Sequence, residues 1–158
     1  MVTEASNTRV DHASRIIIAT PKAIFQAMTD VEALSSWRAP KGMTAVFDRF
    51  EARPNGQYQV TMLYPDDLHG CGKSEPDRDI VHGRFVELVP FEQIVEDVQF
   101  VGPDPSYAGT MRVTTILSPV AGGTKVVISC ENVPVGIKEA DHAEGLASTL
   151  KNLALFIE

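Results

Sequence analysis

Several features that would assign this chain of 158 residues to a functional class are scarce or missing. It has two cysteines, Cys71 and Cys130, which form no C-x-x-C pair, so we expect reduced thiols and a cytoplasmic location. No apolar run approaches the roughly 18 residues of a membrane span, and no membrane partner is expected. The N-terminal residues also lack the basic and then apolar segments of a secretory signal.

Basic residues are outnumbered as well. Lys plus Arg amount to 14 and Asp plus Glu to 21, which leaves a net charge of −7. Phosphate binding needs a basic face, so nucleic acid is not an expected partner. The hydrophobic share of 44% is sufficient for a core. We therefore expect one domain over residues 8–158, preceded by a disordered tail at residues 1–7.

The sequence contains no repeat, but turn and cap residues divide it into short elements. Residues 8–18 alternate as a strand. Thr20 and Asp30 each match a helix N-cap, and the second helix is predicted to end near Trp37. Six more strands are predicted at residues 43–52, 57–64, 79–89, 92–101, 109–118 and 124–132. Residues 65–78 lack periodicity and are predicted to form a loop.

A long helix is predicted from Asp141, because Asp141 and Glu144 match a capping box. Behind them, one apolar stripe is formed by Leu146, Leu150, Leu153 and Ile157. This stripe needs a large apolar surface opposite it, and the strands are the only candidate. We therefore predict an α+β fold in which a curved antiparallel sheet of six to seven strands surrounds the final helix and leaves space beside it.

The most specific patterns of the chain lie in four segments, which are ATPKAIFQAMTDVEALSSW, VELVPFEQIVEDVQF, GGTKVVISCENVP and GLASTLKNLALFIE. Together they resemble START-like proteins and, among them, the activator of heat-shock-protein ATPase homologue-like family, and the resemblance spans residues 10–158. It implies a helix-grip fold, no cofactor, no required metal and frequent homodimers. Two positions depart from the family pattern. Leu146 stands where many members have Trp, and Cys130 where many have His, so a ligand typical of other members is not assumed.

A sheet curved around a helix creates a cleft, and ligand pockets are mostly apolar with a few polar groups. Glu96 shares a strand face with Ile94 and Phe100, which predicts that it points inward. A register slip of one residue would instead place it in water. An inward carboxylate needs a partner. The candidate partners are Arg112, Arg84, His82 and His12.

The sequence leaves the orientation of His82 and Arg84 open. Both are solvated if Phe85 points inward, and both line the cleft if Val86 and Leu88 do. The apolar ligand contacts are predicted to come from Trp37, Tyr64, Phe100, Met111 and Leu150, with Tyr58 in the same wall. A polar ligand end is predicted to meet Glu96, His82 and Arg112.

Other clusters favour no specific chemistry. A metal site at Asp66, Asp67, His69 and Cys71 is not predicted, because their spacing matches no closed zinc pattern. Residues 70–74 lack the spacer of a phosphate-binding loop, although Lys73 is a candidate for attracting an anionic ligand at the cleft mouth. No G-x-S-x-G segment supports a hydrolase.

Three functions follow from these observations. The first is binding of a small hydrophobic or aromatic molecule between the sheet and the final helix. The second is an enzyme of the cyclase or hydratase type that uses Glu96 or His82 as acid or base. The third, which the resemblance suggests, is a co-chaperone-like module that binds a protein and activates a heat-shock-protein ATPase. Such a module would expose an apolar patch and contain little internal cavity.

Overall fold

The computed structural model describes residues 8–40 and 42–158, so the tail predicted at residues 1–7 lies outside the described residues. The elements are β1 (Val10–Ile17), α1 (Pro21–Thr29), α2 (Val31–Trp37), β2 (Thr44–Phe50), β3 (Gln57–Leu63), β4 (Arg78–Val89), β5 (Gln93–Phe100), β6 (Met111–Val120), β7 (Gly123–Glu131) and α3 (Glu139–Ile157), with the single-turn 3-10 helices η1 (Asp66–Leu68) and η2 (Pro105–Tyr107). The strands form one antiparallel sheet in the order β1-β7-β6-β5-β4-β3-β2. This confirms the predicted α+β helix-grip fold.

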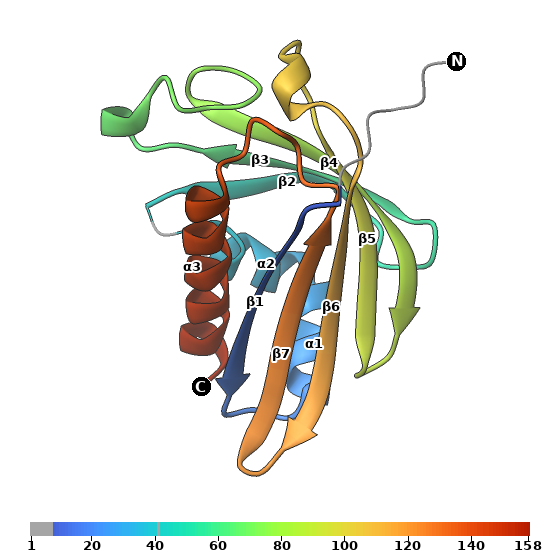
Figure 1. Cartoon of the computed structure of the whole chain (residues 1–158). Helices are drawn as coiled ribbons and strands as arrows, with labels where there is room; N and C mark the ends of the chain where they lie inside the picture. The colour runs from blue at the N-terminus through green and yellow to red at the C-terminus, as the bar shows by residue number, and fades with distance from the viewer. Residues whose placement is uncertain (1–7, 41) are drawn as a thin grey trace.

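The sheet bends around the three helices (Figure 1). Two register shifts contribute to the bend, one between Phe47 and Arg49 in β2 and one between Phe85 and Glu87 in β4. Such bulges increase the local twist of a strand. None of the helices in the described part of the chain is long and apolar enough to cross a membrane.

The predicted caps of the two short helices are confirmed. Thr20 accepts a hydrogen bond from the Ala23 amide at 3.1 Å, and Asp30 accepts one from the Ala33 amide at 3.3 Å. These bonds satisfy amides that have no partner inside the helix. The chain can therefore begin α1 and α2 directly after β1, which places both helices beside the inner face of the sheet (Figure 1).

The predicted start of the last helix is wrong. α3 begins at Glu139, its N-cap is Lys138, and no side chain caps it. Docking of the preceding loop explains the difference, because Ile137 is buried and the Gly136 amide donates to the Ser106 carbonyl at 2.7 Å. The helix begins directly after this docked segment. Asp141 consequently lies within the first turn, where its charge favours the helix dipole.

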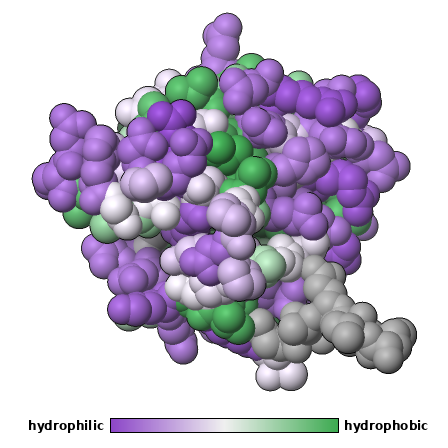
Figure 2. Space-filling view, turned by 90° about the horizontal axis from the view of Figure 1, so that it is seen from above, coloured by the Kyte–Doolittle hydropathy of each residue, from purple (hydrophilic) through white to green (hydrophobic). Residues whose placement is uncertain are grey.

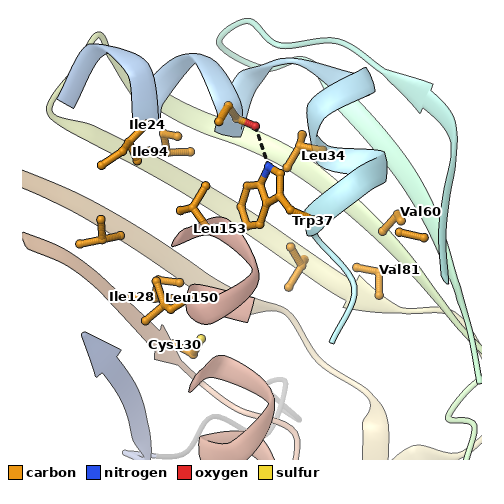
Figure 3. Packing of buried hydrophobic residues seen from close by; sticks show 14 of the residues in the cluster. Ile24, Leu34, Trp37, Val60, Val81, Ile94, Ile128, Cys130, Leu150 and Leu153 are labelled. Carbon is orange, nitrogen blue, oxygen red and sulfur yellow. Dashed lines mark hydrogen bonds between the residues drawn. The ribbon is translucent and has the colours of Figure 1, made fainter. Parts of the chain in front are cut away.

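The apolar stripe of α3 packs into the core as predicted (Figure 3). Leu150 lies beside Ile128 and Cys130 of β7, and Leu153 lies beside Trp37 of α2. The indole Nε1 of Trp37 donates to the Ala27 carbonyl at 3.0 Å, which ties α2 to α1. Side chains therefore fill the contact between α3 and the sheet.

One end of the sheet carries three long connections, namely the β3–β4 loop with η1, the β5–β6 connection with η2, and the loop from β7 to α3 (Figure 1). Figure 2 looks onto this end and shows a band of hydrophobic residues between hydrophilic ones. Each connection exposes one large apolar side chain, and these are Leu68, Val101 and Val135. This end of the molecule is therefore not uniformly polar.

Candidate functional site

A small cavity of about 40 Å³ lies between the α1–α2 helices and strands β2–β5. Its lining consists of Met28, Leu34, Trp37, Arg38, Phe47, Phe50, Tyr58, Val60, Phe85, Ile94 and Glu96. Most of this wall is apolar and much of it aromatic, with Tyr58, Glu96 and Arg38 as the polar members. No residue of α3 lines the cavity, so it lies elsewhere than the predicted space between the sheet and the final helix.

Glu96 points toward the cavity, and its partner is Tyr58. The Tyr58 hydroxyl donates to Glu96 Oε1 at 2.8 Å. None of the partners that the sequence suggested is used, because Arg84, His82, Arg112 and His12 all lie on the opposite face of the sheet or in solvent. A tyrosine hydroxyl therefore takes the place of the expected cation.

Gly83 makes this pairing sterically feasible. Tyr58 is paired with Gly83 of β4, and Gly83 with Val98 of β5, so the tyrosine ring must cross β4 to reach Glu96. A Cβ atom at Gly83 would lie 2.1 Å from Tyr58 Cζ, closer than any real contact. A glycine inside a predicted strand is a sequence signal for such a close approach, and it could have indicated this site.

Burial and neighbouring charges shift the pKa values of Tyr58 and Glu96. Burial raises the pKa of Glu96, while the Tyr58 hydrogen bond and the Arg38 charge oppose that rise. Burial and the charge of Glu96 raise the pKa of Tyr58 well above its usual value. Tyr58 consequently remains a hydrogen-bond donor, and Glu96 is the group that can gain or lose a proton.

Arg38 follows α2 as its C-cap residue and places a positive charge at the same cavity. Its charge acts on Tyr58 of β3, Glu96 of β5 and Cys130 of β7, and opposes the rise that burial causes in the pKa of each. Among the residues that the structure describes, no carboxylate forms an ion pair with Arg38. The sequence alone does not indicate a role for Arg38, because nothing in its local pattern distinguishes it from a surface arginine.

The structure does not bring the predicted ligand-binding residues together in one place. Trp37 and Glu96 line the cavity, whereas Met111 and Leu150 are buried in the core outside it. Tyr64 and Phe100 are half-buried and lie beside Lys73 at one end of the sheet.

His82 and Arg112 lie on the outer face, which corrects their predicted place in the cleft. Phe85 is buried, so alternation along β4 turns His82 outward, where its Nε2 lies 3.1 Å from Gln57 Oε1. Arg112 forms an ion pair with Asp97, with Nε 2.8 Å from Oδ1. Neither side chain can reach the Tyr58–Glu96 pair without crossing the sheet.

Comparison with known proteins identifies the family. A family model described as "Activator of Hsp90 ATPase homolog 1-like protein" matches residues 18–158. The chain belongs to this family. Its fold supports a ligand-binding domain in general. The comparison with curated proteins found no match.

Solved structures share the fold of this chain. Protein CV1439 from Chromobacterium violaceum is 27% identical over 95% of this chain and 98% of its own, with a TM-score of 0.82. Protein NE0264 from Nitrosomonas europaea is 19% identical over 93% of this chain and 92% of its own, with a TM-score of 0.73. Protein Ms6760 from Mycobacterium smegmatis is 14% identical over 100% and 96%, with a TM-score of 0.75. The last two similarities show the fold alone.

Asp11 of β1 forms an ion pair with Arg9 and a hydrogen bond with His142 of α3, two contacts that nothing in the sequence pattern indicated. Asp11 is 7% exposed, and its Oδ2 lies 2.7 Å from Arg9 Nη2 and 2.6 Å from His142 Nδ1. The Arg9 hydrogen bond lowers the pKa of Asp11 against the effect of burial. Because Asp11 is on β1 and His142 on α3, their hydrogen bond attaches the start of the last helix to the edge strand. Cys130, the strand neighbour of Asp11, has its pKa raised to about 12 by burial.

A second hollow, open to solvent and about 410 Å³ in volume, lies between the ends of α2 and α3. Its lining consists of Ser36, Trp37, Ala39, Pro40, Gly42, Met43, Asn152, Leu155 and Phe156. Trp37 lines both the open hollow and the Tyr58–Glu96 cavity. Trp37 is therefore shared by the wall of the cavity and that of the open hollow.

The side chains of the loop at residues 65–78 do not come together as a metal site. Asp66, Asp67, His69 and Cys71 are all exposed. Within the described ranges, no group of three or more His, Cys, Asp or Glu residues could hold a metal ion.

Proposed function

We propose that this protein binds a small apolar molecule whose polar end meets Tyr58, Glu96 and Arg38. The observation that carries the proposal is the Tyr58–Glu96 hydrogen bond inside an aromatic cavity. A carboxyl group with a raised pKa in an apolar pocket is typical of ligand-binding and catalytic sites. The general ligand-binding character of the fold supports the same conclusion.

Ligand entry requires a wall of the cavity to move. A volume of about 40 Å³ accommodates little more than one or two water molecules, whereas ligand pockets are usually about 300 Å³ or larger. The wall formed by α2 is the one that moves, because this helix has seven residues and depends on packing for its stability. Trp37 is on α2, so its displacement would join the cavity to the open hollow of about 410 Å³.

The positive charge of Arg38 at the cavity favours an acidic ligand. A guanidinium forms paired hydrogen bonds to a carboxylate, and Arg38 has no such partner among the described residues. Protonated Glu96 would add a second hydrogen bond to the ligand. We therefore expect a small aromatic or aliphatic carboxylic acid to bind more tightly than the neutral amide of the same shape.

Trp37 provides a direct test, because it is the single tryptophan of the chain and lines the cavity. Benzoate, phenylacetate and octanoate, each with its neutral amide, are titrated against the protein while indole fluorescence is recorded. A saturable change is expected with the wild type. Glu96→Gln and Tyr58→Phe should each weaken binding about tenfold or more, since each removes a hydrogen bond to the polar end.

Arg112→Gln is the matched control, because Arg112 lies on the outer face and its loss should leave binding unchanged. Native mass spectrometry of protein purified from its own host would identify a retained molecule. The proposal fails if no probe gives a saturable signal and the purified protein is always empty. It also fails if Glu96→Gln and Arg112→Gln bind every probe equally.

An enzyme that uses Glu96 as acid or base is the second candidate. The raised pKa of Glu96 favours it, since general acids and bases work best with a pKa near the operating pH. His82 is not a candidate for this role because it lies on the outer face. Incubation with the retained molecule, followed by mass analysis, should show conversion by the wild type and none by Glu96→Gln.

A further inference from the structure

The ammonium group of Lys73 lies among three aromatic rings at the end of the sheet that carries the long connections. Its Nζ atom is 6.0 Å from the ring centre of Tyr64, 5.5 Å from that of Phe100 and 5.9 Å from that of Tyr107. It also lies 3.1 Å from Asp79 Oδ2 and 3.2 Å from the Tyr64 hydroxyl. Rings around a cation beside a carboxylate are the arrangement with which proteins recognise ammonium groups.

The cage, defined as Tyr64, Asp79, Phe100 and Tyr107, is held together without Lys73. The Tyr64 hydroxyl donates to Asp79 Oδ2 at 2.8 Å, and the rings of Phe100 and Tyr107 are in contact, with centres 6.5 Å apart. Asp79 is 4% exposed, and it comes from β4, whereas Phe100 comes from β5 and Tyr107 from η2. The site is thus preorganised by separate elements of the fold.

The side chain of Lys73 can leave this cage while its loop stays in place. The Lys73 backbone amide donates to Asp79 Oδ1 at 2.8 Å, and the Ile80 amide donates to Ser74 Oγ at 2.7 Å. These bonds hold the loop whether or not the ammonium group is bound. The side chain itself is 21% exposed, so the cage opens to solvent on one side. Rotation of the side chain is enough to vacate the site.

We propose that this cage is a binding site for the alkylammonium group of a small molecule, and that Lys73 is the tethered occupant that such a ligand displaces. A positively charged ligand suits Asp79, whose charge Lys73 now balances. The anionic ligand that the sequence suggested for Lys73 would meet this carboxylate instead. The cage is distinct from the Tyr58–Glu96 cavity, and this inference does not depend on the proposed function.

Lys73→Ala removes the tethered competitor and leaves the cage intact. Tetramethylammonium is titrated against the variant and the wild type while the aromatic ring signals of Tyr64, Phe100 and Tyr107 are followed by NMR. A tethered group competes at an effective concentration of about millimolar or more, so the variant should bind about tenfold or more tightly than the wild type. The uncharged tert-butanol, which has a similar shape, should not bind measurably.

Two further variants show whether the cage is responsible. Lys73→Ala combined with Asp79→Asn should lose about tenfold or more in affinity, because the carboxylate that balances the cation is gone. Lys125→Ala, which removes an exposed lysine of β7, should bind like the wild type. Circular dichroism confirms that each variant is folded.

The inference is overturned if Lys73→Ala binds no tetramethylammonium, or if tert-butanol binds equally well. It is also overturned if the wild type binds as tightly as Lys73→Ala, because Lys73 would then not be the competitor.

Discussion

Replacement of Gly83 by alanine tests whether the Tyr58 ring must cross β4 to reach Glu96. The added Cβ would lie 2.1 Å from Cζ, 2.3 Å from Cε2 and 2.5 Å from the hydroxyl oxygen of Tyr58, so the ring must move. Overpacking costs about 1–3 kcal/mol, and the lost hydrogen bond to Glu96 about 1.5–3 kcal/mol. Alanine gains back about 0.5–1 kcal/mol over glycine within a strand, so we expect a net loss of about 2–5 kcal/mol.

Urea unfolding followed by circular dichroism measures this loss as a change in the free energy of unfolding. The same substitution is then made in a Tyr58→Leu background, where the three clashing atoms are absent. There Gly83→Ala should be neutral or stabilise the protein by up to about 1 kcal/mol. Equal losses in both backgrounds would refute the steric argument, because the cost would then have nothing to do with the tyrosine ring.

Three other outcomes are expected. Burial raises the pKa of Glu96 above its unfolded value of 4.5. Protonated Glu96 therefore contributes fully to stability below pH 4.5, and this contribution declines as the pH rises through the pKa of the folded state. Urea unfolding from pH 4 to 8 should show this decline in the wild type, and Glu96→Gln should remove it. A thiol reagent at pH 8 should modify only the exposed Cys71 in the native protein. After unfolding, it should modify Cys130 as well. Two reactive thiols in the native state would contradict the buried position of Cys130. Trp37→Phe should lower the free energy of unfolding by about 1–3 kcal/mol, since the Ala27 carbonyl loses its donor; an unchanged value would argue against that bond.

The elements themselves could be predicted because they depend on neighbours in the chain. Thr20 and Asp30 cap helices through amides three residues away, and the sheet strands alternate with period two. The start of α3 could not be predicted from neighbouring residues in this way. Asp141 and Glu144 match a capping box, but the helix begins earlier because Ile137 is docked into the core.

The candidate site was only partly predictable. Alternation along β5 favoured an inward Glu96 but left a register slip of one residue open, and the structure places Glu96 at the cavity. Its partner Tyr58 is 38 residues away, and the contact depends on the register of β3, β4 and β5 and on the absence of a side chain at Gly83. For His82, the sequence left two orientations open, and the burial of Phe85 chose between them.

The sequence by itself determined the order of strands and helices, the apolar stripe of the last helix and the family, since each of these is written in short segments. Only the tertiary structure decided that Tyr58 is the partner of Glu96, that Arg38 lies at the same cavity and that Lys73 occupies an aromatic cage. The reason is physical: these contacts join residues far apart in the chain, and they form only when strand register and helix docking place the side chains within bonding distance.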